Sequence, residues 1–132
     1  MSNVLDASMT LTWFFEDEAV PSAVEAYARV RSEGALTPQI WLFEVRNAFV
    51  FNERRERITS SQTAQAMAAL EELSVTIDTQ PDLEATMALA RAHGLTFYDA
   101  LYLELAQRRQ ATLLSLDTEL LRAANAEGVA TL

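Results

Sequence analysis

Cysteine and lysine are both missing from this sequence of 132 residues. A chain without cysteine has no disulfide bonds, no thiolate metal ligands and no cysteine nucleophile. A chain without lysine has no Walker-type phosphate-binding lysine, and it cannot use lysine for Schiff-base or general-base chemistry. All 10 basic residues are arginines, so arginine is the only fixed positive charge that can hold a phosphate group. The lack of cysteine fits the cytoplasm, which is the location that we expect.

Glycine, proline and long apolar runs are also scarce. With 3 glycines, 3 prolines, no low-complexity stretch and no internal repeat, the sequence predicts one regular domain over residues 1–132. No apolar run is long enough to cross a membrane, and no basic segment followed by a hydrophobic stretch marks a signal peptide, so we expect no membrane contact. The hydrophobic share of 50% is enough to bury a core without disulfides or structural metals.

The charge balance is strongly acidic, with 19 acidic residues, 10 basic residues and a net charge of −9. On charge alone we would not expect a nucleic-acid partner, because phosphate binding usually requires a basic surface. A metal site built from carboxylates would account for part of the excess. A basic partner protein would account for more of it.

Short apolar stretches alternate with helical patterns along the chain. The predicted strands are 3–6, 35–37, 75–77 and 112–116, with Val129 as a candidate edge strand. The predicted helices are 7–15, 21–34 (opened by Pro21 and closed by Gly34), 40–57, 60–73, 81–93, 96–109 and 117–127. This alternation indicates an α/β fold with a parallel sheet covered by helices on both faces. In such folds, sites form outside the carboxyl ends of the strands.

Two aspartates stand where a predicted strand ends and a helix begins. Asp6 follows Val4 and Leu5, and Asp117 follows the apolar segment 113–116. Each aspartate is also a favoured helix N-cap, which is the structural interpretation. If the two strands are neighbours, the carboxylates meet at one edge of the sheet, where they repel each other unless a cation lies between them.

Two further acids lie among apolar residues. Asp99 stands three residues after Thr96, as in a helix capping box. The acid of a capping box is normally exposed, whereas the neighbours of Asp99 in the sequence are mostly aromatic. Glu44 shares a helical stripe with Trp41 and Ala48, where a lone carboxylate is costly unless it pairs with an arginine or binds a metal. Both the structural and the functional interpretation remain open for each acid.

Together, the four acids form a candidate all-oxygen site. Carboxylates are suitable ligands for Mg²⁺ or Mn²⁺. Such ions activate water and stabilise the attacking and leaving oxygens of a phosphoryl displacement. The only histidine, His93, lies outside the acid motifs, and we expect it to have a structural role at a helix end.

Four motifs in order along the chain resemble those of PIN-domain ribonucleases of the VapC type. The motifs are VLDAS (residues 4–8), FEVRNA (43–48), TFYDALY (96–102) and LSLDTEL (114–120). The resemblance covers essentially the whole chain. It implies a single PIN domain over residues 1–132, with a PIN-like three-layer α/β/α fold and a short central parallel sheet.

The resemblance also implies an activity and its residues. The metal-site acids would be Asp6, Glu44, Asp99 and Asp117, with Ser115, Asn47 and Ser8 in supporting positions. The expected activity is Mg²⁺- or Mn²⁺-dependent cleavage of RNA by a homodimeric toxin that a cognate antitoxin inhibits. The acidic charge departs from what an RNA enzyme suggests.

Two other interpretations remain. The first is an acid-pocket phosphoryl-transfer domain, such as a receiver or a haloacid-dehalogenase-type phosphatase. Both normally use a lysine, which this chain lacks, and the phosphatase would have a second aspartate where Ser8 stands. The second is a catalytically silent PIN-fold module that binds RNA or protein, although loss of one acid would be its signature.

The N-terminal half carries more large aromatics than one inner helix face requires. These aromatics are Trp13, Phe14, Phe15, Trp41, Phe43, Phe49 and Phe51. They belong either to the core and a homodimer interface or to a groove for a partner helix. We expect the antitoxin to lay an apolar segment on this surface and to place an arginine or lysine in the acid pocket.

Overall fold

Four parallel strands form the centre of the molecule in the order β3-β2-β1-β4. In the computed structural model, which describes residues 2–15 and 20–132, the strands are β1 (Asn3–Leu5), β2 (Ala35–Pro38), β3 (Val75–Asp78) and β4 (Thr112–Leu114). Strand β1 is central because Val4 pairs with Leu36 on one side and with Leu113 on the other. Val4 and Leu113 are fully buried, as expected for short apolar strands covered on both faces.

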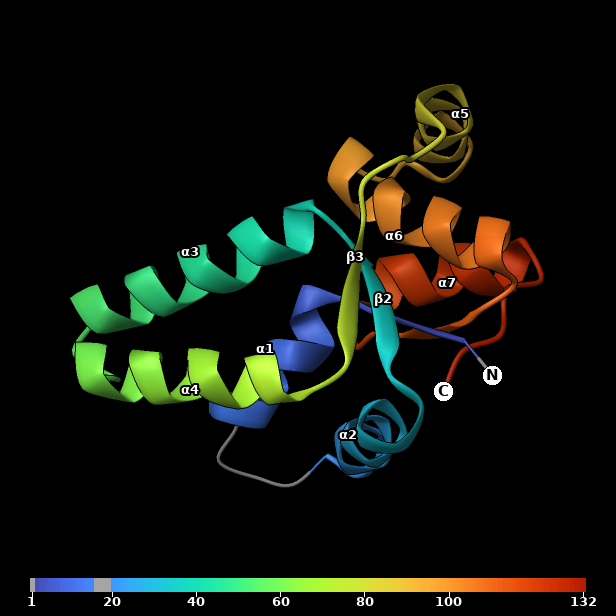
Figure 1. Ribbon diagram of the computed structural model, residues 1–132. Helices are drawn as coiled ribbons and strands as arrows, with labels where there is room; N and C mark the ends of the chain where they lie inside the picture. The colour runs from blue at the N-terminus through green and yellow to red at the C-terminus, as the bar shows by residue number, and fades with distance from the viewer. Residues whose placement is uncertain (1, 16–19) are drawn as a thin grey trace.

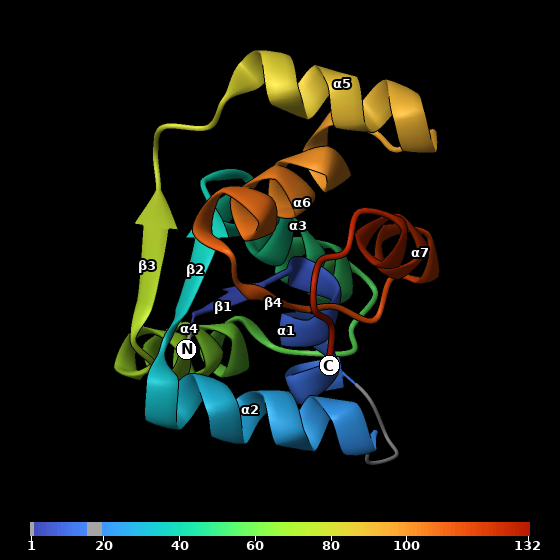
Figure 2. The same cartoon turned by 90° about the vertical axis from the view of Figure 1, so that its right-hand side faces the viewer.

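Helices cover both faces of this sheet (Figures 1 and 2). They are α1 (Ala7–Phe15), α2 (Pro21–Glu33), α3 (Ile40–Arg54), α4 (Ser60–Glu72), α5 (Leu83–His93), α6 (Phe97–Arg109) and α7 (Thr118–Ala126). Helices α1, α3 and α4 lie on one side, and α6 and α7 lie on the other, with α5 packed outside α6 (Figure 1). The predicted three-layer α/β/α fold with a short parallel sheet is confirmed.

Helix α6 is the most enclosed helix, because it packs between the sheet and α5. Five consecutive residues from Tyr102 to Ala106 are buried, including the acidic Glu104. Glu104 accepts a hydrogen bond from Arg108 one turn later at 2.7 Å, and Arg108 also donates to Asp78 at the end of β3. This ion pair network compensates the buried carboxylate and ties α6 to the edge strand.

Two predicted helix boundaries are wrong by more than one residue. The helix expected over 40–57 ends at Arg54, because Glu56 adopts a left-handed backbone conformation with φ of 58° and the Arg57 N–H turns back to the Asn52 carbonyl. The helix expected from Pro81 begins two residues later, because the Asp82 side chain caps it by accepting from the Ala85 N–H at 3.0 Å.

Two predictions about strands also need correction. The strand expected over 112–116 ends at Leu114, because its pairing with β1 ends where Leu5 meets Leu114. The short edge pairing expected at Val129 instead joins Thr131 to Leu113. In the described part of the chain, no helix is both long enough and apolar enough to cross a membrane.

Candidate active site

The carboxyl ends of β1 and β4 bring the first and last acid motifs together. Leu5 pairs with Leu114 in register, and the Asp6 N–H donates to the Leu114 carbonyl at 3.2 Å. The next residues of the two strands therefore face each other, and the Ser115 hydroxyl donates to Asp6 Oδ2 at 2.5 Å. The expectation that the two strands are neighbours is confirmed.

Asp6 is the most buried acid of the group, with 3% of its surface exposed. Its Oδ1 accepts from the Met9 N–H at 2.9 Å, so the N-cap interpretation is confirmed. The Ser8 hydroxyl donates to the same carboxylate at 2.8 Å. Burial raises the pKa of Asp6 to about 6, and the charge of Asp117 adds to that rise, although the hydrogen bonds oppose it.

Asp117 and Asp99 open the two helices on the other side of the site. Asp117 caps α7 by accepting from the Leu120 N–H at 3.0 Å, and its own N–H donates to Ser115 Oγ at 3.0 Å. Asp99 lies in the first turn of α6, where its N–H donates to the Thr96 hydroxyl at 3.1 Å. Partial burial raises the pKa of Asp99, and the nearby charge of Asp117 raises it further. The cap fixes the Asp117 carboxylate, and the start of α6 places Asp99 within range of its charge.

Glu44 reaches the same space from α3. Its Oε1 accepts a 2.5 Å hydrogen bond from the Tyr102 hydroxyl, which holds the glutamate towards α6. Burial raises the pKa of Glu44, and the charge of Asp99 adds to this effect. Among the described residues, no arginine forms an ion pair with Glu44, so the alternative of a core-edge ion pair is wrong.

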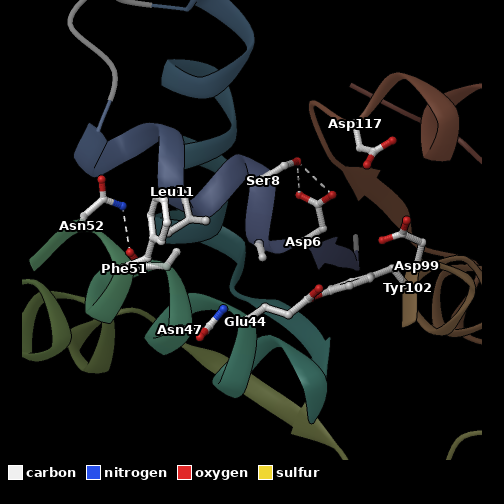
Figure 3. Close-up of a pocket in the computed structure, with 12 residues that line it drawn as sticks. Asp6, Ser8, Leu11, Glu44, Asn47, Phe51, Asn52, Asp99, Tyr102 and Asp117 are labelled. Carbon is white, nitrogen blue, oxygen red and sulfur yellow. Dashed lines mark hydrogen bonds between the residues drawn. The ribbon is translucent and has the colours of Figure 1, made fainter. Parts of the chain in front are cut away.

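One pocket of about 460 Å³ is lined by all four acids. Its lining residues are Asp6, Ala7, Ser8, Leu11, Glu44, Asn47, Ala48, Phe51, Asn52, Asp99, Tyr102 and Asp117. The carboxylates of Asp6, Asp99 and Asp117 face a common space, with Glu44 approaching from α3 (Figure 3). None of the lining residues is an arginine or a histidine, so the charge of the acids is not balanced inside the pocket.

This donor set is suitable for a divalent cation. Four carboxylates without a basic neighbour, three of them with raised pKa, would be stabilised by positive charge between them. Across residues 2–15 and 20–132, no three acidic or histidine side chains lie close enough together to hold one ion jointly. That spacing still fits Mg²⁺, because this ion usually takes one or two carboxylates and completes its shell with water.

The supporting residues differ in how closely they contact the acids. Ser8 and Ser115 both donate to Asp6, and the Ser8 hydroxyl also accepts from the Leu116 N–H at 3.0 Å. The two serines therefore fix the β1–β4 edge around the first acid. Asn47 lines the pocket but is exposed.

Sequence reasoning missed Tyr102, Leu11 and Asn52 as pocket residues. Tyr102 follows Asp99 by three residues on a helix, a spacing that places both on one face and that could have identified it. The only histidine, His93, lies outside the pocket and pairs with Glu127 at 2.6 Å, in line with the expected structural role.

The family model described as PIN domain matches residues 4–126. A search of the curated proteins found no match. PAE2754 from Pyrobaculum aerophilum has a similar structure, with a TM-score of 0.74 and 23% identity, over 93% of this chain and 84% of that chain.

Two other similar structures are more distant. FitAcB from Neisseria gonorrhoeae has a TM-score of 0.59 and 18% identity, over 100% of this chain and 96% of that chain. A toxin–antitoxin complex from Klebsiella pneumoniae has a TM-score of 0.57 and 18% identity, over 84% of this chain and 82% of that chain. At these identities, the three structures indicate a shared fold.

Proposed function

Since this chain belongs to the PIN domain family, we propose that it is a divalent-metal-dependent endoribonuclease and the toxin of a toxin–antitoxin pair. The observation that carries the proposal is the convergence of four carboxylates in one pocket with no basic residue in its lining. All four acids are retained, which favours an enzyme over a silent module that binds RNA or protein. The absence of lysine continues to disfavour a phosphoryl-transfer domain of the receiver or phosphatase type.

One or two of the four acids Asp6, Glu44, Asp99 and Asp117 would bind the Mg²⁺ or Mn²⁺ directly, and the others would bind its water shell. When bound, the ion supplies water activation and charge stabilisation for the displacement at phosphorus. The residues of the chain supply the rest. Carboxylates that are already capped and braced lose little freedom when they bind a cation, so the site is preorganised.

Three of the four acids have a distinct support. Asp6 is held by Ser8 and Ser115, and Asp117 is fixed as the cap of α7. Glu44 is held by the Tyr102 hydroxyl, so it can accept a proton or a cation without a change of rotamer. These supports keep the acids aimed at one space before substrate arrives.

Cleavage assays on total RNA test this proposal. We expect cleavage with Mg²⁺ or Mn²⁺, none with EDTA, and a 5′-phosphate on the product, because water rather than the RNA 2′-hydroxyl is the attacker. Asp117→Asn should abolish cleavage. Asp82→Asn is the matched control, since Asp82 also caps a helix but lies outside the pocket. A 2′,3′-cyclic phosphate product would refute the mechanism, and no cleavage with either metal would favour the silent module.

We also propose that the protein is a homodimer that a small antitoxin inhibits. The surface supports this, because eight large apolar side chains are exposed among the described residues. They include Phe43 and Phe51, whereas Trp41 and Phe49 are buried, so the aromatic residues divide between core and surface. Sedimentation should give twice the mass of the 14.7 kDa chain. A toxin that cuts RNA would act in the cytoplasm.

The antitoxin would place an arginine or lysine among the pocket carboxylates, and its apolar segment would cover exposed aromatics. Co-purification with the product of the neighbouring gene should capture it. An antitoxin with its basic residues replaced by alanine should no longer inhibit cleavage. Full inhibition by this variant would show that no basic residue needs to enter the pocket.

A further inference from the structure

The pocket extends well beyond the space between the acids. Its volume of about 460 Å³ falls in the range of ligand-binding pockets, roughly 300–1,000 Å³. Asp6, Asp99 and Asp117 lie at one end, and Leu11, Phe51 and Asn52 lie at the other, with Glu44 between them (Figure 3). We call the end formed by Leu11, Asn47, Phe51 and Asn52 the distal end; it contains no acid. An ion would fill only the acidic end.

Phe51 presents an open aromatic ring at the distal end. It follows Glu44 by two helical turns, and 52% of its surface is exposed, whereas Phe49 on the same helix is 1% exposed. The Arg55 guanidinium stands 5.3 Å from the centre of the Phe51 ring. Core packing therefore does not account for this ring, and its remaining surface is available to a flat partner.

Two amides flank the ring. Asn52 is 8% exposed, and its Nδ2 donates to the Ala48 carbonyl at 2.8 Å. Its buried Oδ1 has no hydrogen-bond partner within residues 2–15 and 20–132. Because this acceptor is fully buried and the amide N–H is bonded to Ala48, Asn52 forms part of the wall of the distal end. Asn47, whose amide is exposed, lines the same pocket one turn from Glu44.

Three arginines lie at the end of α3 and just beyond it, interspersed with Glu53 and Glu56. Arg54, Arg55 and Arg57 are exposed and account for three of the 10 arginines of the chain. Within the described ranges, none of the three forms an ion pair with a carboxylate. The arginines outnumber the glutamates by one in residues 53–57, so this segment carries a small local excess of positive charge on an otherwise acidic protein.

Resting on the proposed ribonuclease function, we propose that the distal end binds one unpaired base of the RNA strand next to the bond that is cut. The base stacks on Phe51, its edge meets the exposed amide of Asn47, and Arg55 contacts the phosphate backbone. A base can reach such a platform only when it is unstacked, so binding here requires a single-stranded segment. The exposed amide of Asn47 and the guanidinium of Arg55 beside the ring favour RNA over an apolar side chain of a partner protein as the occupant.

Binding of fluorescein-labelled RNA separates this role from a structural one. The probes are single-stranded decamers of adenylate, cytidylate or uridylate and a duplex of matched length. Fluorescence anisotropy would be measured with Ca²⁺ in place of Mg²⁺, and gels would confirm that the RNA stays intact. We expect Phe51→Leu to weaken single-strand binding on the order of tenfold, and Phe51→Tyr to retain it. Phe43→Leu is the matched control, since Phe43 is 62% exposed on the same helix but lies outside the pocket.

Abasic probes locate the stacked base. In the wild type, an abasic residue at one position of the decamer should weaken binding about tenfold, and in Phe51→Leu it should cause no further loss. Arg55→Gln should reduce the slope of log affinity against log salt by about 0.7, the value for one phosphate contact in a single strand.

Several outcomes would overturn the inference. Unchanged affinity in Phe51→Leu, an equal loss in Phe43→Leu, or duplex binding as tight as single-strand binding would each do so. If the wild type still cleaves RNA with Mg²⁺ in those cases, only the base-binding subsite is wrong, and Phe51 belongs to a protein-binding surface. If the wild type neither binds nor cleaves any RNA, the proposed function fails as well.

Discussion

Replacing Asp6 by asparagine should stabilise the metal-free protein at neutral pH while abolishing cleavage. The buried carboxyl has a pKa of about 6, against 3.8 for an unperturbed aspartate. At about 1.4 kcal/mol per pKa unit, ionised Asp6 costs the folded protein roughly 3 kcal/mol at pH 7. Asparagine avoids that cost, and its carbonyl can still accept from the Met9 N–H. We therefore expect a net gain of about 1–3 kcal/mol, since the amide does not reproduce every serine contact.

The pH dependence follows from the raised pKa. Below about pH 4, Asp6 is protonated in both the folded and the unfolded chain, and its ionisation costs nothing. As the pH rises, the unfolded chain loses this proton first, so the stability of the wild type falls until the pH passes the folded value of about 6. Asp6→Asn should lack this fall. The difference between the two proteins should therefore be small at pH 4 and largest above pH 7.

Thermal melts in EDTA at pH 4, 5.5 and 7.5 measure this difference. A gain of 1 kcal/mol should raise the melting temperature by roughly 3–5 °C for a domain of this size. Asp82→Asn controls for the cap, because Asp82 accepts from the Ala85 N–H but lies outside the pocket. Adding Mg²⁺ should stabilise the wild type more than Asp6→Asn. A large loss of metal-free stability at pH 7.5 would refute the reasoning and make the cap the main role of Asp6.

Three other substitutions test the surroundings of the site. Ser115→Ala removes a hydrogen bond that lowers the pKa of Asp6, so the fall in stability of the metal-free protein with rising pH should extend to higher pH than in the wild type. Cleavage should slow about 10–100-fold, which is the usual effect of losing a supporting residue. Tyr102→Phe frees Glu44, so titration calorimetry should show about tenfold weaker Mg²⁺ binding. Gly34→Ala places a Cβ 2.8 Å from a backbone oxygen at a φ of +78°, so urea unfolding should show a loss of about 2 kcal/mol with cleavage by the remaining folded protein unchanged.

The acids at the strand ends could be predicted from sequence because each follows a short apolar stretch. Asp6 and Asp117 are also helix caps, and aspartate is a favoured N-cap residue, so the local sequence indicated where each strand ends and each helix begins. The capping interpretation and the pocket interpretation are therefore not alternatives, since one oxygen can serve the backbone while the carboxylate faces the pocket. The in-register pairing of Leu5 with Leu114, which brings the acids together, depends on tertiary structure and leaves no local trace.

The end of α3, the burial of its aromatic residues and the support of Glu44 could not be predicted from a local sequence pattern. Helix α3 ends without a glycine or proline, since Glu56 itself takes the left-handed conformation, so the predicted helix ran on. Phe49 and Phe51 are only two residues apart, yet one is buried and the other is exposed at the pocket. Helical spacing assigns them to different faces, but it does not say which face meets the core. The Tyr102–Glu44 hydrogen bond joins residues 58 positions apart, a contact that single-sequence patterns do not encode.

The pairing of β1 with β4 has a consequence for synthesis of the protein. Asp6 leaves the ribosome before Ser115, which fixes it and lies 109 residues further along. At translation rates of about 5–20 residues per second, roughly 5–20 s pass between the synthesis of Asp6 and the synthesis of Ser115. A chain released before residue 115 carries Asp6 without the strand that holds it. Copies that end before residue 115 would therefore lack an assembled site, and under the proposed function only chains that extend beyond it would cleave RNA.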